Sequence, residues 1–287
     1  LIFVPPRFHR YKEISNQILE IFHEYTDRVE PLSIDEAYLD VTYAKKGKPS
    51  ATLIAREIKK RIFETTRLTA SAGVSYNKFL AKVASDVNKP DGLFVVTPEQ
   101  ATDFIDNLEI RKFYGIGKVT AEKMNQTGIW FGRDLKKLDR HELLRLFGKA
   151  GNYYYEICRG EDHRQVEPVR ERKSVGAEQT FLTDLYLETE LESQLLNIAE
   201  ILWRRIQRAK VKAKTLTLKY KYADFEQHTR SKTIADYFGS FDEIASESKK
   251  LMRAEGGFIK GIRLLGLSVT NFLHDEISKP VQLTIKF

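Results

Sequence analysis

The chain has 287 residues, of which 42% are hydrophobic and 30% charged, and this composition predicts a soluble globular protein of two or three domains. The single cysteine, Cys158, excludes an internal disulfide and argues against a structural zinc site, and no segment is apolar enough to span a membrane. A net charge of +7 favours a polyanionic partner. Because a single cysteine fits a reducing compartment and no segment could span a membrane, we expect a cytoplasmic protein.

The first predicted helix covers residues 8–26, and the segment 31–42 that follows holds two adjacent carboxylates, Asp35 and Glu36, among strand-forming residues. A turn in which Asp35 ends one strand and Glu36 begins the next explains the pair without a function. The alternative is a divalent metal site, because magnesium prefers carboxylate and phosphate oxygens. Neighbours on a regular strand point to opposite faces, so both carboxylates reach one metal only where the backbone bends.

The next stretch predicts a helix capped by Ser50, a strand of small residues over 69–75 and a short helix over 77–86. This pattern indicates an α+β sheet with helices on one face. The segment 87–92 is a turn by composition and carries Lys89, which is either a triphosphate contact or an ordinary exposed lysine.

Thr97 caps a new helix and marks the start of a second domain. Within this domain, Gly115 and Gly117 lie between two predicted helical segments, and Lys118 follows them directly. Glycines allow a tight turn, and the free amides at the start of the next helix bind phosphate well. The pattern predicts a helix-hairpin-helix that contacts nucleic-acid backbone, with a plain helix–helix corner as the alternative.

Residues 163–172 read as an extended linker, and the remainder predicts a split βαβ domain in the order β-α-β-β-α-β. A capping box at Thr189 and Glu192 predicts the start of its first helix. From Trp203 to Tyr222 the charged residues are all basic, which indicates a solvated face or a surface along phosphates. The predicted elements lie at residues 173–181, 189–210, 214–222, 229–235, 241–254 and 262–272.

The segments 33–40, 71–75 and 77–92 together resemble the Y-family DNA polymerases, most closely the bacterial DNA polymerase IV (DinB) type. The resemblance implies an α+β multidomain fold. Its expected parts are an incomplete palm of antiparallel sheet and helices at 1–98, a helical thumb at 99–162, a linker at 163–172, a little finger at 173–275 and a tail at 276–287.

The resemblance also implies roles for individual residues. Asp35 and Glu36 are expected to be catalytic and to hold two Mg²⁺ ions, and Lys89 to contact the nucleotide triphosphate. The tail is similar to a sliding-clamp-binding peptide, with Gln282, Leu283, Ile285 and Phe287 as its contacts. The expected contacts to primer-template DNA are Gly115, Gly117, Lys118, Lys173, Ser174, Arg204 and Arg208.

The function implied is template-directed, error-prone translesion synthesis by a monomeric enzyme, with deoxynucleotides, DNA and a sliding clamp as partners and no membrane partner. The family's first palm strand, which carries a further metal-binding aspartate, and its fingers are expected before Leu1. We therefore expect this chain alone to bind DNA and polymerise weakly or not at all. The alternative is a non-catalytic DNA- and clamp-binding fragment; an RNA-binding protein is disfavoured because no RNP-type aromatic motif occurs.

Overall fold

The structure is a computed structural model that describes residues 1–47, 49–255, 258 and 260–273. The chain divides into two compact units, residues 1–170 and 171–287, and we describe each by itself. The four residues expected to contact a sliding clamp lie outside the described residues. Within the described ranges, no helix is long and apolar enough to cross a membrane.

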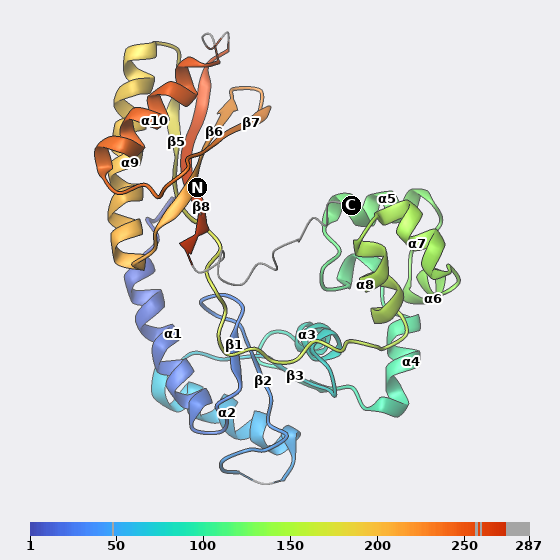
Figure 1. Ribbon diagram of the computed structural model, residues 1–287. Coiled ribbons are helices and arrows are strands. Elements are labelled where there is room, and N and C mark those ends of the chain that lie inside the picture. The colour runs from blue at the N-terminus through green and yellow to red at the C-terminus, as the bar shows by residue number, and fades with distance from the viewer. Residues whose placement is uncertain (48, 256–257, 259, 274–287) are drawn as a thin grey trace, which may run out of the picture. The chain divides into compact units, whose positions relative to one another are not determined.

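The first unit begins with short strands packed against long helices (Figure 1). Strands β1 and β2 pair antiparallel, whereas β3 and β4 pair in parallel and are connected by a helix, α3. In order, the elements are α1 (Phe8–His23), β1 (Val29–Pro31), β2 (Ala37–Leu39), α2 (Ala51–Thr66), β3 (Ala72–Val74), α3 (Lys78–Val87) and β4 (Leu93–Val95).

Helices α1 and α2 share a small core. The apolar stripe of α2, residues Ile54, Ile58 and Ile62, is buried and packs with Ile21 and Tyr25. Ser50 is the residue before α2, as predicted, but its side chain makes no capping hydrogen bond. The predicted strand over 69–75 is shorter than expected and covers only β3.

Helix α3 lies directly against β3 because Gly73 has no side chain. A Cβ atom built on Gly73 would lie 2.0 Å from the carbonyl oxygen of Ala81 and 2.4 Å from the amide nitrogen of Ser85. Of the two meanings that small residues in this strand can have, close approach of a ligand or of a helix, the structure shows the packed helix.

The rest of the first unit is helical. Its helices are α4 (Pro98–Asp106), the 3-10 turn η1 (Ile110–Lys112), α5 (Lys118–Gln126), α6 (Gly132–Lys136), α7 (Arg140–Phe147) and α8 (Ala150–Ile157). Their buried side chains form one core with Phe79, Leu80 and Val83 of α3. Helix α3 therefore joins the strand region to the helical region.

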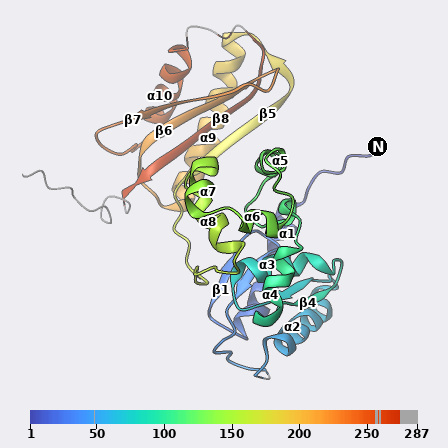
Figure 2. The same cartoon turned by 90° about the vertical axis from the view of Figure 1, so that its right-hand side faces the viewer.

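The second unit is the predicted β-α-β-β-α-β domain. It comprises β5 (Val175–Leu185), α9 (Glu188–Ala209), β6 (Ala213–Tyr222), β7 (Gln227–Thr233), α10 (Phe241–Arg253) and β8 (Ile262–Phe272). The strands form one antiparallel sheet in the order β5-β8-β6-β7, and both helices lie on the same face of it (Figures 1 and 2). The capping box predicted at Thr189 is wrong, because α9 begins at Glu188 and follows Leu187, which makes no side-chain cap.

The packing of Gly73 gives a first prediction. Gly73→Ala should destabilise the first unit by about 1–3 kcal/mol, because the new methyl group meets backbone atoms that cannot move without separating α3 from β3. Gly117→Ser is the control, because a Cβ at Gly117 meets nothing within 4 Å and serine is favoured at the start of a helix. Urea unfolding monitored by circular dichroism measures both; equal stability of the two variants would contradict this packing account.

Candidate active site and nucleic-acid interface

Asp35 and Glu36 lie in the turn between β1 and β2, where the backbone leaves the strand geometry. The turn is closed by the amides of Leu32 and Ser33, which donate to the carbonyl of Glu36 at 2.8 and 3.3 Å. The Ser33 hydroxyl donates to the Asp35 carboxylate and accepts from the Asp35 amide. The bend supplies the condition under which both carboxylates can reach one metal ion, and both line the same cleft.

This cleft has a volume of about 1440 Å³ and lies between β2 of one small sheet and β3 of the other. Lys82 and Lys89, on α3 and on the turn after it, line the cleft together with the two carboxylates. The structure thus brings Lys89 to the same cavity as Asp35 and Glu36, although more than fifty positions separate them in the chain.

Ion pairs connect the carboxylate turn to α3. Lys82 lies 3.3 Å from Glu36 and 3.4 Å from Asp86, and Lys89 lies 2.5 Å from Asp86. Burial raises the pKa of Asp86, but its bonds to Lys89 and Lys82 outweigh burial and lower the pKa. The hydrogen bond to Asp86 in turn raises the pKa of Lys89. Lys89 therefore carries a full charge that is held by an exposed, exchangeable partner.

The donor set fits a divalent ion that also binds substrate phosphates. Asp35 is exposed and Glu36 is partly exposed, so their oxygens can reach a ligand in the cleft. Across the residues that the structure describes, no group of three or more His, Cys, Asp or Glu side chains could hold a metal. Magnesium often takes only one or two carboxylates and completes its shell with water and phosphate, so the pair is consistent with it.

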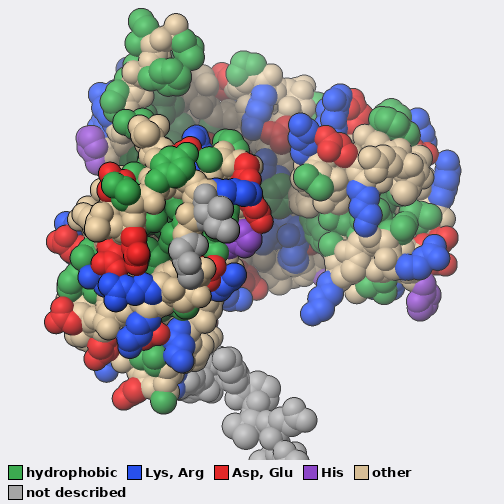
Figure 3. All heavy atoms as spheres, turned by 90° about the horizontal axis from the view of Figure 1, so that it is seen from above, with side chains coloured by type: hydrophobic (Ala, Val, Ile, Leu, Met, Phe, Trp, Pro, Cys, Tyr) green, Lys and Arg blue, Asp and Glu red, His purple; other side chains and the backbone are tan. Residues whose placement is uncertain are grey.

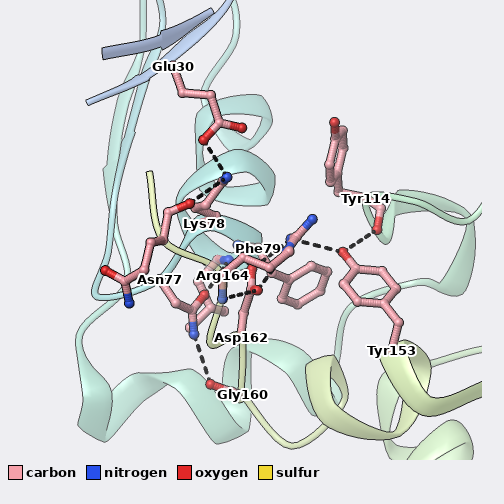
Figure 4. A network of polar contacts seen from close by, with 11 residues as sticks. Glu30, Asn77, Lys78, Phe79, Tyr114, Tyr153, Gly160, Asp162 and Arg164 are labelled. Carbon is pink, nitrogen blue, oxygen red and sulfur yellow. Dashed lines mark hydrogen bonds and ion pairs between the residues drawn. The ribbon is translucent and has the colours of Figure 1, made fainter. Parts of the chain in front are cut away.

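A polar network holds residues 160–167 against the strand region, so the first part of the predicted linker is docked (Figure 4). Lys78 donates to Glu30 at 2.6 Å and to the carbonyl of Gln165 at 3.0 Å. Glu30 also accepts from the amide of Glu167 at 2.8 Å.

Asp162 is the centre of the second half of this network. It accepts from the amide of Phe79 at 2.9 Å and pairs with Arg164 at 2.7 Å (Figure 4). Arg164 also donates to the hydroxyl of Tyr153, which donates to the carbonyl of Tyr114. The segment after α8 is thereby tied to α3 and to the turn before α5.

The two glycines of the helix-hairpin-helix segment, Gly115 and Gly117, lie in different environments. Gly115 has a φ of +93°, and a Cβ there would lie 3.0 Å from the ring of Tyr153. Gly117 is exposed and precedes α5, and Lys118 is the first residue of that helix, with its side chain 89% exposed. The first amides of α5 have no partner within the helix. The segment before Gly115 is the single turn η1 rather than a longer helix.

The second unit has a polar sheet face on one side and, on the other, the helix α9, whose C-terminal end carries three arginines. Leu216, Leu218 and Tyr220 of β6 are buried against the helices. They alternate with Thr215, Thr217 and Lys219 on the other face, where Thr215 is also buried. The neighbouring strand β7 adds Ser231 and Thr233, which pair with these threonines through their hydroxyls. Sequence reasoning missed this face. The alternation of β6 was the available signal, whereas the hydroxyl pairs join residues of two different strands.

The predicted DNA contacts of this unit do not gather in one place. Lys173 and Ser174 are exposed and directly precede β5. Arg204 and Arg208 are exposed on α9, which packs on the other face of the sheet. On the surfaces that Figure 3 shows, basic side chains are interspersed with acidic ones rather than gathered in one patch.

Comparison with known proteins identifies the family. Residues 1–86 match the impB/mucB/samB family, residues 172–285 its C-terminal domain, and residues 98–129 the helix-hairpin-helix motif of the same family. A DNA polymerase IV 2 of Agrobacterium fabrum is 49% identical over 276 residues, which cover 96% of this chain and 77% of the relative. A DNA polymerase IV of Leptospira interrogans is 50% identical over 277 residues, covering 94% of this chain and 76% of the relative.

Solved structures of Y-family DNA polymerases resemble this chain as well. A Y-family DNA polymerase chimera of Dbh and Dpo4 is 29% identical, with a TM-score of 0.85 over 95% of this chain and 79% of the other. An insertion ternary complex of Dbh DNA polymerase is 28% identical, with a TM-score of 0.60 over 94% and 78%. The chain belongs to the Y-family DNA polymerases. Within them it is of the DinB type, and it spans about three quarters of the curated relatives' length.

The Y-family polymerase is thus a DNA-directed DNA polymerase of the translesion class. Its α+β architecture fits a palm, a thumb with a helix-hairpin-helix and a little finger, and the family uses divalent metal ions. Sequence reasoning missed Asp86 as the partner of Lys89. The i+3 and i+4 spacing of Asp86 from Lys89 and Lys82 was the available signal.

Asp162 generates a pH prediction. Burial raises its pKa, but the hydrogen bonds from Arg164 outweigh burial and hold the pKa below the usual 3.8. The ionised form therefore stabilises the fold above the usual pKa, and this contribution is lost as pH falls through the lowered value. Asp162→Asn should reduce stability by about 1–3 kcal/mol at neutral pH and flatten its acid dependence.

The measurement is a series of urea midpoints of the first unit from about pH 7 to about pH 3. Asp27→Asn is the control, because Asp27 is 80% exposed and pairs only at the surface with Lys45. An unchanged acid dependence in Asp162→Asn would show that the network does not depend on this carboxylate.

Proposed function

We propose that this polymerase adds deoxynucleotides to a primer 3′-end in the cleft between β2 and β3. Asp35 and Glu36 are the catalytic, metal-binding residues, and Lys89 contacts the incoming triphosphate. The observation that carries the proposal is the meeting of two carboxylates and Lys89, from separate turns, around one cleft. The likeness to an insertion ternary complex of Dbh DNA polymerase supports a polymerase that holds its substrates together.

The chain's own residues account for positions and charge in this reaction. Two Mg²⁺ ions held by Asp35 and Glu36 would supply activation of the primer hydroxyl and neutralisation of phosphate charge. Lys82 holds the carboxylate of Glu36 beside the primer end. Lys89 exchanges Asp86 for the triphosphate and offsets its negative charge.

The cleft also supports the prediction that a further strand completes the palm. In the region that the structure describes, β2 pairs only with β1 and β3 only with β4, so each presents a free edge to the cleft. Apolar side chains of α1 and α2, including Ile18 and Ile54, line it as well. An added strand would pair with both edges and cover this apolar surface.

DNA binding is proposed to be independent of sequence. The free amides at the start of α5, with Gly115, Gly117 and Lys118, suit the phosphate backbone. Lys173 and Ser174 are exposed and directly precede β5, an edge strand of the little-finger sheet. Arg204 and Arg208 lie on α9, on the helix-covered side of the sheet. We expect them to contribute mainly long-range attraction to the DNA.

The tail is proposed to bind a sliding clamp. The residues concerned are Gln282, Leu283, Ile285 and Phe287, in a pattern of spaced apolar side chains suited to docking on a partner. The polymerase would act as a monomer in the cytoplasm, held at the primer by its clamp.

The metal site predicts the effect of its carboxylates on catalysis. In the full-length polymerase that contains this chain, Asp35→Asn and Glu36→Gln should each reduce primer extension roughly 100-fold, because the metal-binding charge is lost. Single-nucleotide incorporation with Mg²⁺ measures this, and Asp103→Asn, an exposed change on α4, is the control. Extension at the wild-type rate in Asp35→Asn would refute the site.

The same assay on residues 1–287 alone tests the rival, a non-catalytic DNA- and clamp-binding fragment. We expect DNA binding with little extension, because Asp35 and Glu36 would lack the further metal-binding aspartate and because β2 and β3 border the cleft with free edges in the region that the structure describes. Extension at the full-length rate would contradict the proposal that a further strand completes the palm.

A crossed pair of changes separates DNA binding from clamp binding. Removing residues 282–287 should abolish retention on a sliding clamp and leave duplex affinity unchanged. Lys173→Ala should weaken duplex binding and reduce its salt slope by about 1, with clamp retention intact.

The double variant Arg204→Ala/Arg208→Ala should weaken duplex binding less than Lys173→Ala does. Fluorescence anisotropy over a salt series measures affinity; a larger loss in the arginine variant would place the DNA on the helical face.

A further inference from the structure

Lys59 on α2 holds the turn that carries Lys89. Its ammonium group donates to the carbonyl oxygens of Asp91 at 2.6 Å and Gly92 at 3.1 Å. It also lies 3.0 Å from the carboxylate of Asp91. An ammonium has three hydrogens to donate, and these three oxygens account for all of them.

Lys59 therefore faces the turn rather than the ligand space of the cleft. Its side chain is 16% exposed, against 75% for Lys60, the next residue on the same helix. A lysine that bound phosphate directly would need free donors and access. Lys59 has neither, although it lies at the border of the cleft.

The turn requires such support because its backbone is unusual. Asp91 has a φ of +50°, in the left-handed region that residues with a side chain rarely adopt. A Cβ on Gly92 would lie 2.0 Å from the carbonyl oxygen of Asn88, so the chain folds back tightly there. The carbonyls that Lys59 binds belong to these two constrained residues.

We propose that Lys59 is a positioning residue, which fixes the turn over residues 88–92 and so places the ammonium of Lys89 at the triphosphate. This inference rests on the proposed role of Lys89. Asp86 holds the side chain of Lys89 from α3, whereas Lys59 fixes the backbone of its turn from α2. Two helices thus define the place of one lysine.

The test compares Lys59→Met, Lys59→Arg, Lys60→Met and Lys89→Met in the full-length polymerase that contains this chain. Lys59→Met should raise KM for the deoxynucleotide about tenfold and change kcat less, because a misplaced Lys89 weakens nucleotide binding. Lys59→Arg keeps the charge and several donors and should recover most of the loss. Lys60→Met should match the wild type.

The double variant Lys59→Met/Lys89→Met decides whether Lys59 acts through Lys89. Its KM should equal that of Lys89→Met alone, because no contact remains to be positioned. Amide hydrogen exchange should show faster exchange at residues 88, 89, 91 and 92 in Lys59→Met than in Lys60→Met. Additive effects on KM, or an unchanged exchange rate in Lys59→Met, would overturn the inference.

The two proposals fail in distinguishable ways. If Lys89→Met leaves KM unchanged, the triphosphate role of Lys89 is wrong. If Lys89→Met raises KM but Lys59→Met does not, the role of Lys89 stands and Lys59 is not its positioning residue.

Discussion

Two neighbouring carboxylates at the border of a cleft repel each other, and the structure offsets that repulsion with one lysine from α3 and another from the turn after it. Lys82 reaches Glu36, and Asp86 connects Lys82 to Lys89, so charge alternates along four side chains. Each such pair near the surface contributes only about 0.2–1 kcal/mol, so the series orders the site more than it stabilises the fold. This series of ion pairs depends on the position of α3 relative to the turn that carries Asp35 and Glu36.

The position of α3 follows from packing on three sides. Gly73 lets the helix lie against β3, the side chains of Phe79, Leu80 and Val83 join it to the thumb core, and Lys78 at its start binds Glu30. The same helix therefore contacts the strand region, supports the thumb core and carries Lys82, and the turn that follows it carries Lys89. A change that shifts α3 alters the charge pattern of the cleft and the attachment of the thumb together.

Local patterns predicted much of this fold, and long-range contacts account for what they missed. The expected succession of strands and helices over residues 173–272 and the helix expected after Ser50 agree with the structure, because each prediction depends on residues a few positions apart. The bond from Lys59 to Asp91 spans 32 positions and that from Lys78 to Gln165 spans 87. Such partners are set by tertiary packing, and no spacing in the sequence indicates them.

The central claim is that Asp35, Glu36 and Lys89 form one site for a metal-bound nucleotide. The most direct measurement is nuclear magnetic resonance of the chain titrated with a Mn²⁺–deoxynucleotide complex, whose unpaired electrons broaden nearby amide signals. The account predicts that signals of residues 33–37 and of the turn over 88–92 broaden together, at the same concentration. Broadening at one of these turns without the other, or elsewhere in the chain, would contradict a shared site.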